Sequence, residues 1–228
     1  KAKEDKKRAR TLSDEQSGTT IEDESASKRS VNDIIRRRSH MILIAQNQTG
    51  LNNIFKLISE SYKPENYYRY PRIDYSLLDK YGEGIIAASA CLGGVYAGNY
   101  WQNCSYDEDG KFIEVDMDGA LTAMRDTTER MMAIFGDRWY GELQWNSVSH
   151  QHTLNKLIIQ MHKEYGIKLI STADSHYPNP DAWKDRELYK RLGWLGKSKP
   201  GYESNELPVS VEEIGYELYP KNGDQMWH

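Results

Sequence analysis

Two residues with metal-binding side chains stand two positions apart near the end of an apolar stretch. Asp174 and His176 lie in "STADSHYPN", directly after the run 167–170. Alternate residues of an extended strand point to the same face, so both side chains can reach one ion if the strand continues through them. The alternative is two polar residues in an ordinary turn, and the residues alone leave both possibilities open.

Cys91 and His40 are the other two candidate ligands. Cys91 follows the apolar stretch 84–90 and opens into a glycine turn, whereas His40 begins the apolar run 40–47. Imidazole, thiolate and carboxylate together suit Zn²⁺ or another divalent first-row metal. Cys91 could instead be a small buried hydrophobe, and His40 a half-buried polar residue. His40 is also hard to place at a strand mouth, because it starts an apolar run rather than ending one.

Other polar residues carry a weaker signal. His150 and His152 are two positions apart and do not share a helical face, and His162 is ten residues beyond His152, so we expect all three at the surface. Glu142, in mid-strand, is expected to be satisfied by a neighbouring hydrogen bond. The glycine-rich stretch 82–98 has the spacing of neither a P-loop nor a dinucleotide fingerprint.

Apolar periodicity predicts alternating strands and helices from residue 40 onward. The predicted strands are 40–47, 84–94, 138–145 and 167–174, and the predicted helices are 49–62, 74–81, 116–136, 150–166 and 180–194. This β/α order favours an α/β fold with a parallel sheet, either open or closed into a barrel. In such folds functional groups gather at the C-terminal ends of the strands, where Cys91 and Asp174 stand.

Composition indicates a soluble protein of one or two domains. Of 228 residues, 38% are hydrophobic and 28% charged, with a mean hydropathy of -0.80. The sequence contains no run of 18 apolar residues, so no membrane span is predicted, and no signal peptide is predicted because the N-terminus is charged rather than apolar. Two cysteines do not make a disulfide framework, which favours a reducing, cytoplasmic setting. A net charge of -4 argues against tight non-specific DNA binding by this piece alone.

The segment 1–39 differs from the rest of the chain. It has no aromatic residue and 11 Lys/Arg against 8 Asp/Glu, so it carries +3 while the remainder carries -7. We expect a charged, disordered insertion or linker, because such a segment cannot bury enough apolar surface to order itself. A basic arm that touches nucleic acid is the alternative. Because the chain begins with Lys1 and ends without a tail-like composition, we also expect a fragment cut at both ends.

Several stretches together resemble one family. "HMILIAQNQTGLNNIFKLIS", "YPRIDYSLL", "YGEGIIAASACLGG", "YGELQW" and "GIKLISTADSHYPNPDAWKDRELYKRLG" are similar, in order, to segments of the PHP (polymerase and histidinol phosphatase) domain of the bacterial DNA polymerase III alpha subunit. The likeness runs from residue 40 to about 195. The stretch 207–227, "LPVSVEEIGYELYPKNGDQMW", resembles the family's continuation towards the polymerase core.

The resemblance implies a distorted (β/α)₇ barrel with a multi-metal site. Residues 40–195 would be the C-terminal part of this PHP barrel, and 196–228 the connection towards the polymerase palm domain. The family's opening H-x-H and T-D-H segments, and a further glutamate, would lie upstream of Lys1. Zn²⁺ or Mn²⁺ is the expected metal, no catalytic residue can be named, and the family's ligand positions fall on His40, Cys91, Asp174 and His176.

The resemblance also implies a function for the parent protein. That protein would be a replicative DNA-directed DNA polymerase, with Mg²⁺ at a polymerase site absent from this chain. Its partners would be primer-template DNA, dNTPs and other replisome subunits, with no membrane. The PHP domain itself would be a metal-dependent 3′–5′ exonuclease or phosphoesterase. A non-catalytic structural or partner-docking module is one alternative, and a stand-alone PHP phosphatase is another.

Overall fold

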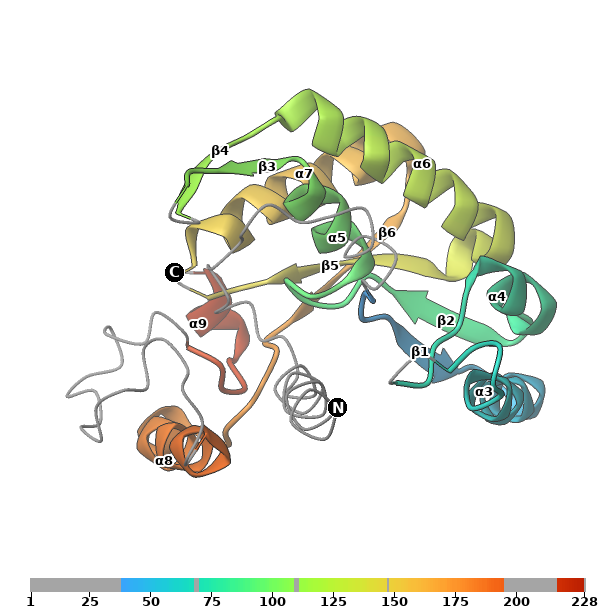
Figure 1. The fold of residues 1–228 in the computed structure, drawn as a ribbon, viewed down its shortest axis with the longest axis horizontal. Coiled ribbons are helices and arrows are strands. Elements are labelled where there is room, and N and C mark those ends of the chain that lie inside the picture. Colours follow the sequence, from blue (N-terminus) through green and yellow to red (C-terminus); the bar gives the residue numbers. More distant parts are fainter. Residues whose placement is uncertain (1–37, 68–69, 109–110, 147, 195–216, 228) are drawn as a thin grey trace, which may run out of the picture. The chain divides into compact units, whose positions relative to one another are not determined.

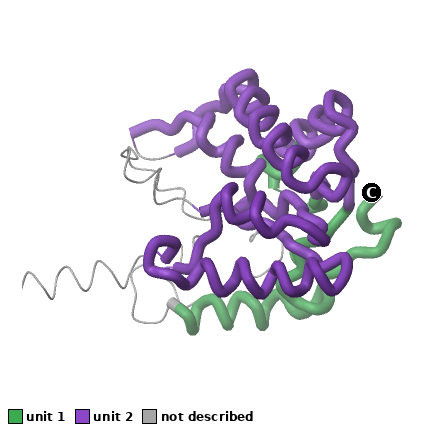
Figure 2. The backbone as a smooth tube through the Cα atoms, turned by 90° about the vertical axis from the view of Figure 1, so that its right-hand side faces the viewer, with its two compact units in different colours: residues 1–18, 144–152, 171–228 green, residues 19–143, 153–170 purple. Residues whose placement is uncertain are grey.

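The computed structural model describes residues 38–67, 70–108, 111–146, 148–194 and 217–227. Nearly all of the predicted charged segment, and most of the predicted connection to the palm, therefore lie outside the described residues. The chain divides into two compact units, shown in different colours in Figure 2. Of the described residues, those in 38–143 and 153–170 form the large unit, and those in 144–152, 171–194 and 217–227 form the small unit.

Within the described residues, four strands form one mixed sheet in the order β1-β2-β5-β6 (Figure 1). They are β1 (Ile42–Ala45), β2 (Ile85–Ala88), β5 (Trp139–Gln144) and β6 (Lys168–Thr172). β2 and β5 are parallel, but β1 runs antiparallel to β2. The predicted α/β class is therefore confirmed, whereas the prediction of a wholly parallel sheet is wrong at β1.

The antiparallel pairing follows from what the chain does between β1 and β2. Helix α3 (Gln48–Ser61) comes first, capped by the Asn47 side chain, which accepts from Gly50 N at 3.0 Å. A loop and α4 (Tyr75–Tyr81) follow before β2. β2 then starts beside the end of β1, where Gln46 N donates to Gly84 O at 2.9 Å. A single helix between the two strands would bring the chain back so that β2 ran parallel to β1. The additional loop and α4 bring the chain to the opposite end, so β2 runs antiparallel to β1.

The connection from β2 to β5 contains elements that the sequence pattern did not predict. α6 (Met117–Phe135) is the predicted helix, with Asp116 as its N-cap and Gly136, at φ 59°, at its end. The missed elements are α5 (Val95–Gln102) and the hairpin of β3 (Cys104–Tyr106) and β4 (Phe112–Val115). Each is eight residues or shorter, and "VYAGNYWQ" is rich in aromatic and small residues that weaken helical periodicity.

A buried hydrogen-bond chain ties β5 to α5 and α6. The indole of Trp139 donates to Tyr96 Oη at 2.9 Å, and Tyr96 Oη lies 2.7 Å from Thr128 Oγ1. Thr128 in turn donates to Met124 O at 2.7 Å, so every polar group along this chain is satisfied. Burial raises the pKa of Tyr96 to about 12. Gly141, two residues after Trp139 and on the same strand face, lies against Ile158 of α7 (Ser149–Tyr165).

The face of β1 that points away from α5 is apolar and exposed. Leu43 pairs with Ala87, which pairs with Trp139, so these three residues share the face that α5 covers. Ile42 and Ile44 point to the other face and are 40% and 51% exposed. β1 is also an outer strand of the described sheet.

The small unit has its own apolar cluster of Tyr177, Trp183 and Leu218. Leu218 N donates to Tyr177 Oη at 3.0 Å, which joins the segment after β6 to the C-terminal part of the chain. The predicted helix 180–194 is confirmed as a 3₁₀ turn (Pro180–Ala182) followed by α8 (Trp183–Trp194), and α9 (Gly223–Trp227) ends the described chain. None of the helices in the described ranges is both long and apolar enough to cross a membrane.

An ion pair between α6 and α7 generates a pH prediction. Arg125 holds Glu164 with two bonds of 2.7 and 2.8 Å, and Gln160 adds a third, so the pKa of Glu164 falls from 4.5 to about 2. The stabilisation from Glu164 is therefore complete above about pH 4.5 and is lost as the pH falls towards 2. We expect Glu164→Gln to be less stable than the wild type at pH 7, with a gap in melting temperature that narrows below pH 4.5.

Thermal unfolding from pH 7 to pH 3 would measure this gap. Glu114→Gln, on β4, is the matched control, because it removes a carboxylate outside this ion pair. A gap that stays constant down to pH 3 would contradict the assignment.

Candidate metal centre

The direction of β1 explains how His40 reaches the end of β2. Ile42 pairs with Ala88, so the N-terminal end of β1 lies beside the C-terminal end of β2. Beyond these strands His40 forms a bridge with Gly94, and its backbone N donates to Gly93 O at 2.8 Å. His40, which begins one apolar run, therefore stands at the same edge of the sheet as Cys91, which follows another.

The structure brings His40 and Cys91 together. Nδ1 of His40 lies 3.7 Å from Sγ of Cys91. A tetrahedral Zn²⁺ with bonds of about 2.0 Å to nitrogen and about 2.3 Å to sulfur separates two such ligands by about 3.5 Å. Cys91 is half-buried and His40 is exposed, so the pair is accessible from solvent. The separation and the ligand types fit two ligands of one divalent ion.

The turn that carries Cys91 is anchored on both sides. Ser89 N donates to Tyr140 O at 3.1 Å, and the Ser89 hydroxyl accepts from Glu142 N at 2.9 Å, which fixes the turn to β5. The indole of Trp101 on α5 donates to the carbonyl of Leu92 at 2.8 Å. Sequence reasoning missed Ser89 and Trp101, because both act through backbone hydrogen bonds that residue spacing does not predict.

Asp174 and His176 lie in the small unit, beyond the end of a strand. β6 ends at Thr172, and Asp174 has a positive φ of 46°, so strand alternation does not govern their spacing as the sequence suggested. His176 N donates to Leu218 O at 2.7 Å, which anchors the residue to the cluster around Leu218. The structure therefore places the D-x-H pair in the loop after β6 rather than on one face of a strand.

The ring of His176 has a defined orientation. Its Nδ1 lies 2.6 Å from the backbone carbonyl oxygen of Asp174. Because a carbonyl oxygen can only accept, Nδ1 carries the hydrogen and Nε2 of the neutral ring keeps its lone pair. This arrangement, with one nitrogen donating to a backbone carbonyl and the other available, is typical of metal-binding histidines.

The four predicted ligands are thus found as two pairs, one in each unit. Among the described residues, no group of three or more His, Cys, Asp or Glu side chains is arranged to hold a metal ion. The pair of His40 and Cys91 satisfies the distance for two ligands of one ion. The four-residue metal site stays a prediction.

The other polar residues singled out in the sequence have different surroundings. His152 and His162 are exposed as expected, and His150 is half-buried. His162 Nδ1 lies 2.7 Å from Ile167 O, a contact that closes the turn after α7. Glu142 is only 1% exposed on β5, and its backbone N contributes the bond to Ser89 described above.

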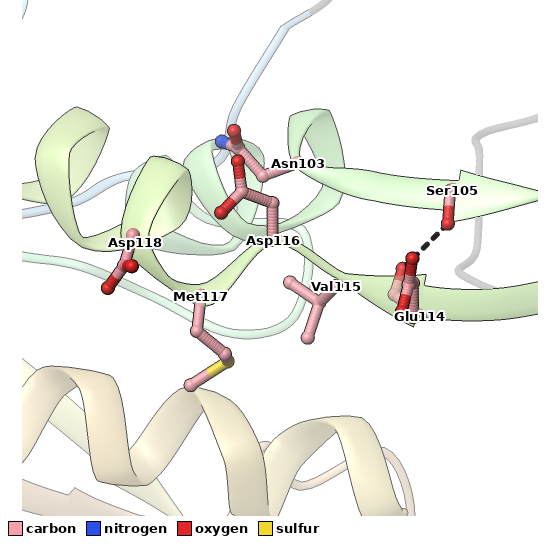
Figure 3. Close-up of a pocket in the computed structure, with 7 residues that line it drawn as sticks. All are labelled: Asn103, Ser105, Glu114, Val115, Asp116, Met117 and Asp118. Carbon is pink, nitrogen blue, oxygen red and sulfur yellow. Dashed lines mark hydrogen bonds between the residues drawn. The ribbon is translucent and has the colours of Figure 1, made fainter.

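A separate cavity lies at the β3–β4 hairpin (Figure 3). Its volume is about 460 Å³, and it is lined by Asn103, Ser105, Glu114, Val115, Asp116, Met117 and Asp118. None of the four predicted ligands lines it. The Asp116 carboxylate accepts from Gly119 N at 3.0 Å as the N-cap of α6, so helix capping accounts for part of the acidic lining.

Comparison with known proteins identifies the family. The profile of the PHP domain matches residues 12–146, which is more than half of the chain. The chain belongs to the PHP domain family. This match begins within the predicted charged segment, and the boundaries of 40–195 for the PHP domain stay a prediction.

Curated relatives of this PHP chain are DNA polymerase III alpha subunits. The subunit of Aquifex aeolicus is 42% identical over 179 residues, which cover 78% of this chain and 14% of the relative. The subunit of Helicobacter pylori strain 26695 is 34% identical over 191 residues, covering 84% and 15%. That of Borreliella burgdorferi is 30% identical over 191 residues, covering 82% and 15%. The chain thus matches only about one seventh of the length of these relatives.

The orientation of the His176 ring is directly testable. We expect ¹⁵N NMR of the metal-free chain above pH 8 to show hydrogen on Nδ1 and a lone pair on Nε2 of His176, because the Asp174 carbonyl accepts from Nδ1. His162 makes the same kind of contact with Ile167 O and serves as an internal positive control. The exposed His152 serves as the reference. Hydrogen on Nε2 of His176 would contradict the proposed ligand geometry.

Proposed function

We propose that this PHP domain binds a divalent transition metal, Zn²⁺ or Mn²⁺, through His40 and Cys91, with Asp174 and His176 as further ligands. The observation that supports it best is the 3.7 Å approach of His40 Nδ1 to Cys91 Sγ at the end of β2. Gly93 N also donates to Cys91 Sγ at 3.4 Å, which orients the sulfur beside the imidazole. Thiolate and neutral imidazole are the forms that bind metal.

The reaction we propose is hydrolysis of a phosphodiester at a DNA 3′ end. A bound divalent metal would supply an activated water and offset the negative charge of the phosphate. His40 and Cys91 would be two of its ligands, held beside the end of β2. His176 would offer Nε2, because its Nδ1 is engaged with the Asp174 carbonyl. No side chain is assigned as the general base.

We also propose that the sheet is part of a PHP barrel. β1 is an outer strand of the described sheet, and Ile42 and Ile44 are 40% and 51% exposed on the face away from α5. Sheets in α/β proteins normally have both faces covered, and closing a barrel would bury these side chains. The exposed isoleucines therefore support further strands on this edge.

The parent protein we propose is a replicative DNA polymerase. The relatives compared are named DNA polymerase III subunit alpha, and they match from 78% to 84% of this chain. On this proposal the polymerase site, with Mg²⁺, primer-template DNA and dNTPs, lies in the part of the relatives that this chain does not match. Other replisome subunits would be its partners, and the cytoplasm its location.

A non-catalytic role is the second candidate. Within the described residues of either unit, no three ligand-type side chains converge, whereas a catalytic Zn²⁺ site normally has three protein ligands. On this alternative the metal would stabilise the domain inside the polymerase rather than turn over substrate.

Substitution of the cysteine separates these possibilities. We expect Cys91→Ser to lower the affinity of the chain for Zn²⁺ at least tenfold, because serine is a much weaker ligand for Zn²⁺ than a thiolate. Cys104→Ser is the matched control, since Cys104 is the other half-buried cysteine and lies on β3. Zn²⁺ competition titrations and thermal unfolding measure the two effects, and release of nucleotides from 3′-labelled single-stranded DNA measures activity.

Three outcomes are informative. Loss of metal and of nuclease activity in a Cys91→Ser chain that remains folded supports catalysis. A melting temperature of Cys91→Ser far below that of the wild type, together with no nuclease activity in the metal-loaded wild type, supports the structural role. A wild-type chain that binds Zn²⁺ no better than Cys91→Ser overturns the metal site itself.

A further inference from the structure

We propose that Gly93 is a positioning residue for the His40–Cys91 pair, and that its lack of a side chain is what allows the two ligands to meet. The inference rests on the proposed metal site, because it concerns how that site is held. Gly93 lies two residues after Cys91, in the turn that follows β2.

Gly93 touches both ligands through its backbone. Its carbonyl oxygen accepts from His40 N at 2.8 Å, which fixes the main chain of the histidine. Its N–H donates to Cys91 Sγ at 3.4 Å, which orients the sulfur. Any residue except proline could provide these two bonds, so they do not by themselves require glycine.

The imidazole ring of His40 requires the glycine. A Cβ atom added at Gly93 would lie 3.1 Å from Nδ1, 3.2 Å from Cε1 and 3.6 Å from Cγ of His40. Carbon atoms normally pack at about 3.5 to 4.0 Å, so the ring would have to move by a few tenths of an ångström. Metal–ligand distances tolerate only about 0.2 Å. The edge of the ring that carries Nδ1, the atom facing Cys91 Sγ, is the edge a methyl group would displace.

A methyl group at Gly93 is expected to weaken metal binding rather than to destabilise the fold. His40 is exposed, so its ring can swing into solvent without disturbing the core. The neighbouring glycine is different, because a Cβ at Gly94 would lie 2.0 Å from the backbone oxygen of Ser89. Backbone atoms in an anchored turn cannot move aside as a side chain can. Gly94 is therefore needed for the turn, and Gly93 for the ligands.

The test is a Gly93→Ala substitution in the full chain, titrated with Co²⁺ in place of Zn²⁺. We expect about 10- to 100-fold weaker Co²⁺ binding, the range seen when groups that support metal ligands are removed. The thiolate-to-Co²⁺ charge-transfer absorption should also shift or weaken, while the melting temperature of the metal-free chain stays unchanged. Gly193→Ala, on α8, is the control, because a Cβ there meets nothing within 4 Å.

Each other result counts against the inference. Equal Co²⁺ affinity and equal spectra in the wild type and Gly93→Ala would overturn it while leaving the metal site intact. A parallel loss of affinity and of metal-free melting temperature would show a structural role instead. A wild type that binds no Co²⁺ would overturn the proposed function, and this inference with it.

A measurement on the wild type covers the case in which Gly93→Ala does not fold. The close approach predicts a nuclear Overhauser effect between the Hα atoms of Gly93 and Hε1 of His40. Its presence supports the ring position from which the inference starts. Its absence overturns the inference whatever the variant does.

Discussion

The antiparallel pairing of β1 with β2 is the constraint on which the candidate site depends. Four residue pairs, from Ile42 with Ala88 to Ala45 with Ile85, set both the direction and the register of β1. A shift of one residue would turn the half-buried Leu43 to the exposed face of the sheet and Ile42 to the face that α5 covers. It would also move His40 by about 3.3 Å along the strand, further than any metal site tolerates. Packing of the core and placement of the imidazole are therefore satisfied by the same register.

Hydrogen bonds of the fold, rather than a metal, hold Cys91 in place. The Ser89 hydroxyl and the Trp101 indole fix the two sides of the turn, and both bonds join it to elements of the large unit. Folding of the large unit therefore already orders this turn, and an ion that binds there does not have to offset the entropy of ordering it. His176 is arranged on the same principle, since its backbone N is held by Leu218 and its ring by the Asp174 carbonyl. Each pair of candidate ligands is preorganised within its own unit.

The sequence predicted elements and ligand types better than it predicted geometry. Long periodic helices such as α6 and α7 were recovered to within one residue at each end, because 17 to 19 residues give a clear period. The short α5 and the β3–β4 hairpin were missed for lack of length. The direction of β1 could not be predicted from the apolar pattern either, since a parallel and an antiparallel strand can have the same run of apolar residues. For that reason His40 was named as a ligand but could not be placed.

The charge of the chain adds a reason to connect metal binding with any contact to DNA. The net charge is -4, and residues 40–228 carry -7, so the polyanionic backbone of DNA is repelled by most of this sequence. A divalent ion held by His40 and Cys91 would place positive charge at the one edge of the sheet where two ligand side chains already meet. A phosphate drawn to that edge would be attracted by the ion rather than by a basic surface. On this view, the affinity of the chain for a phosphate group would depend on whether the ion is bound.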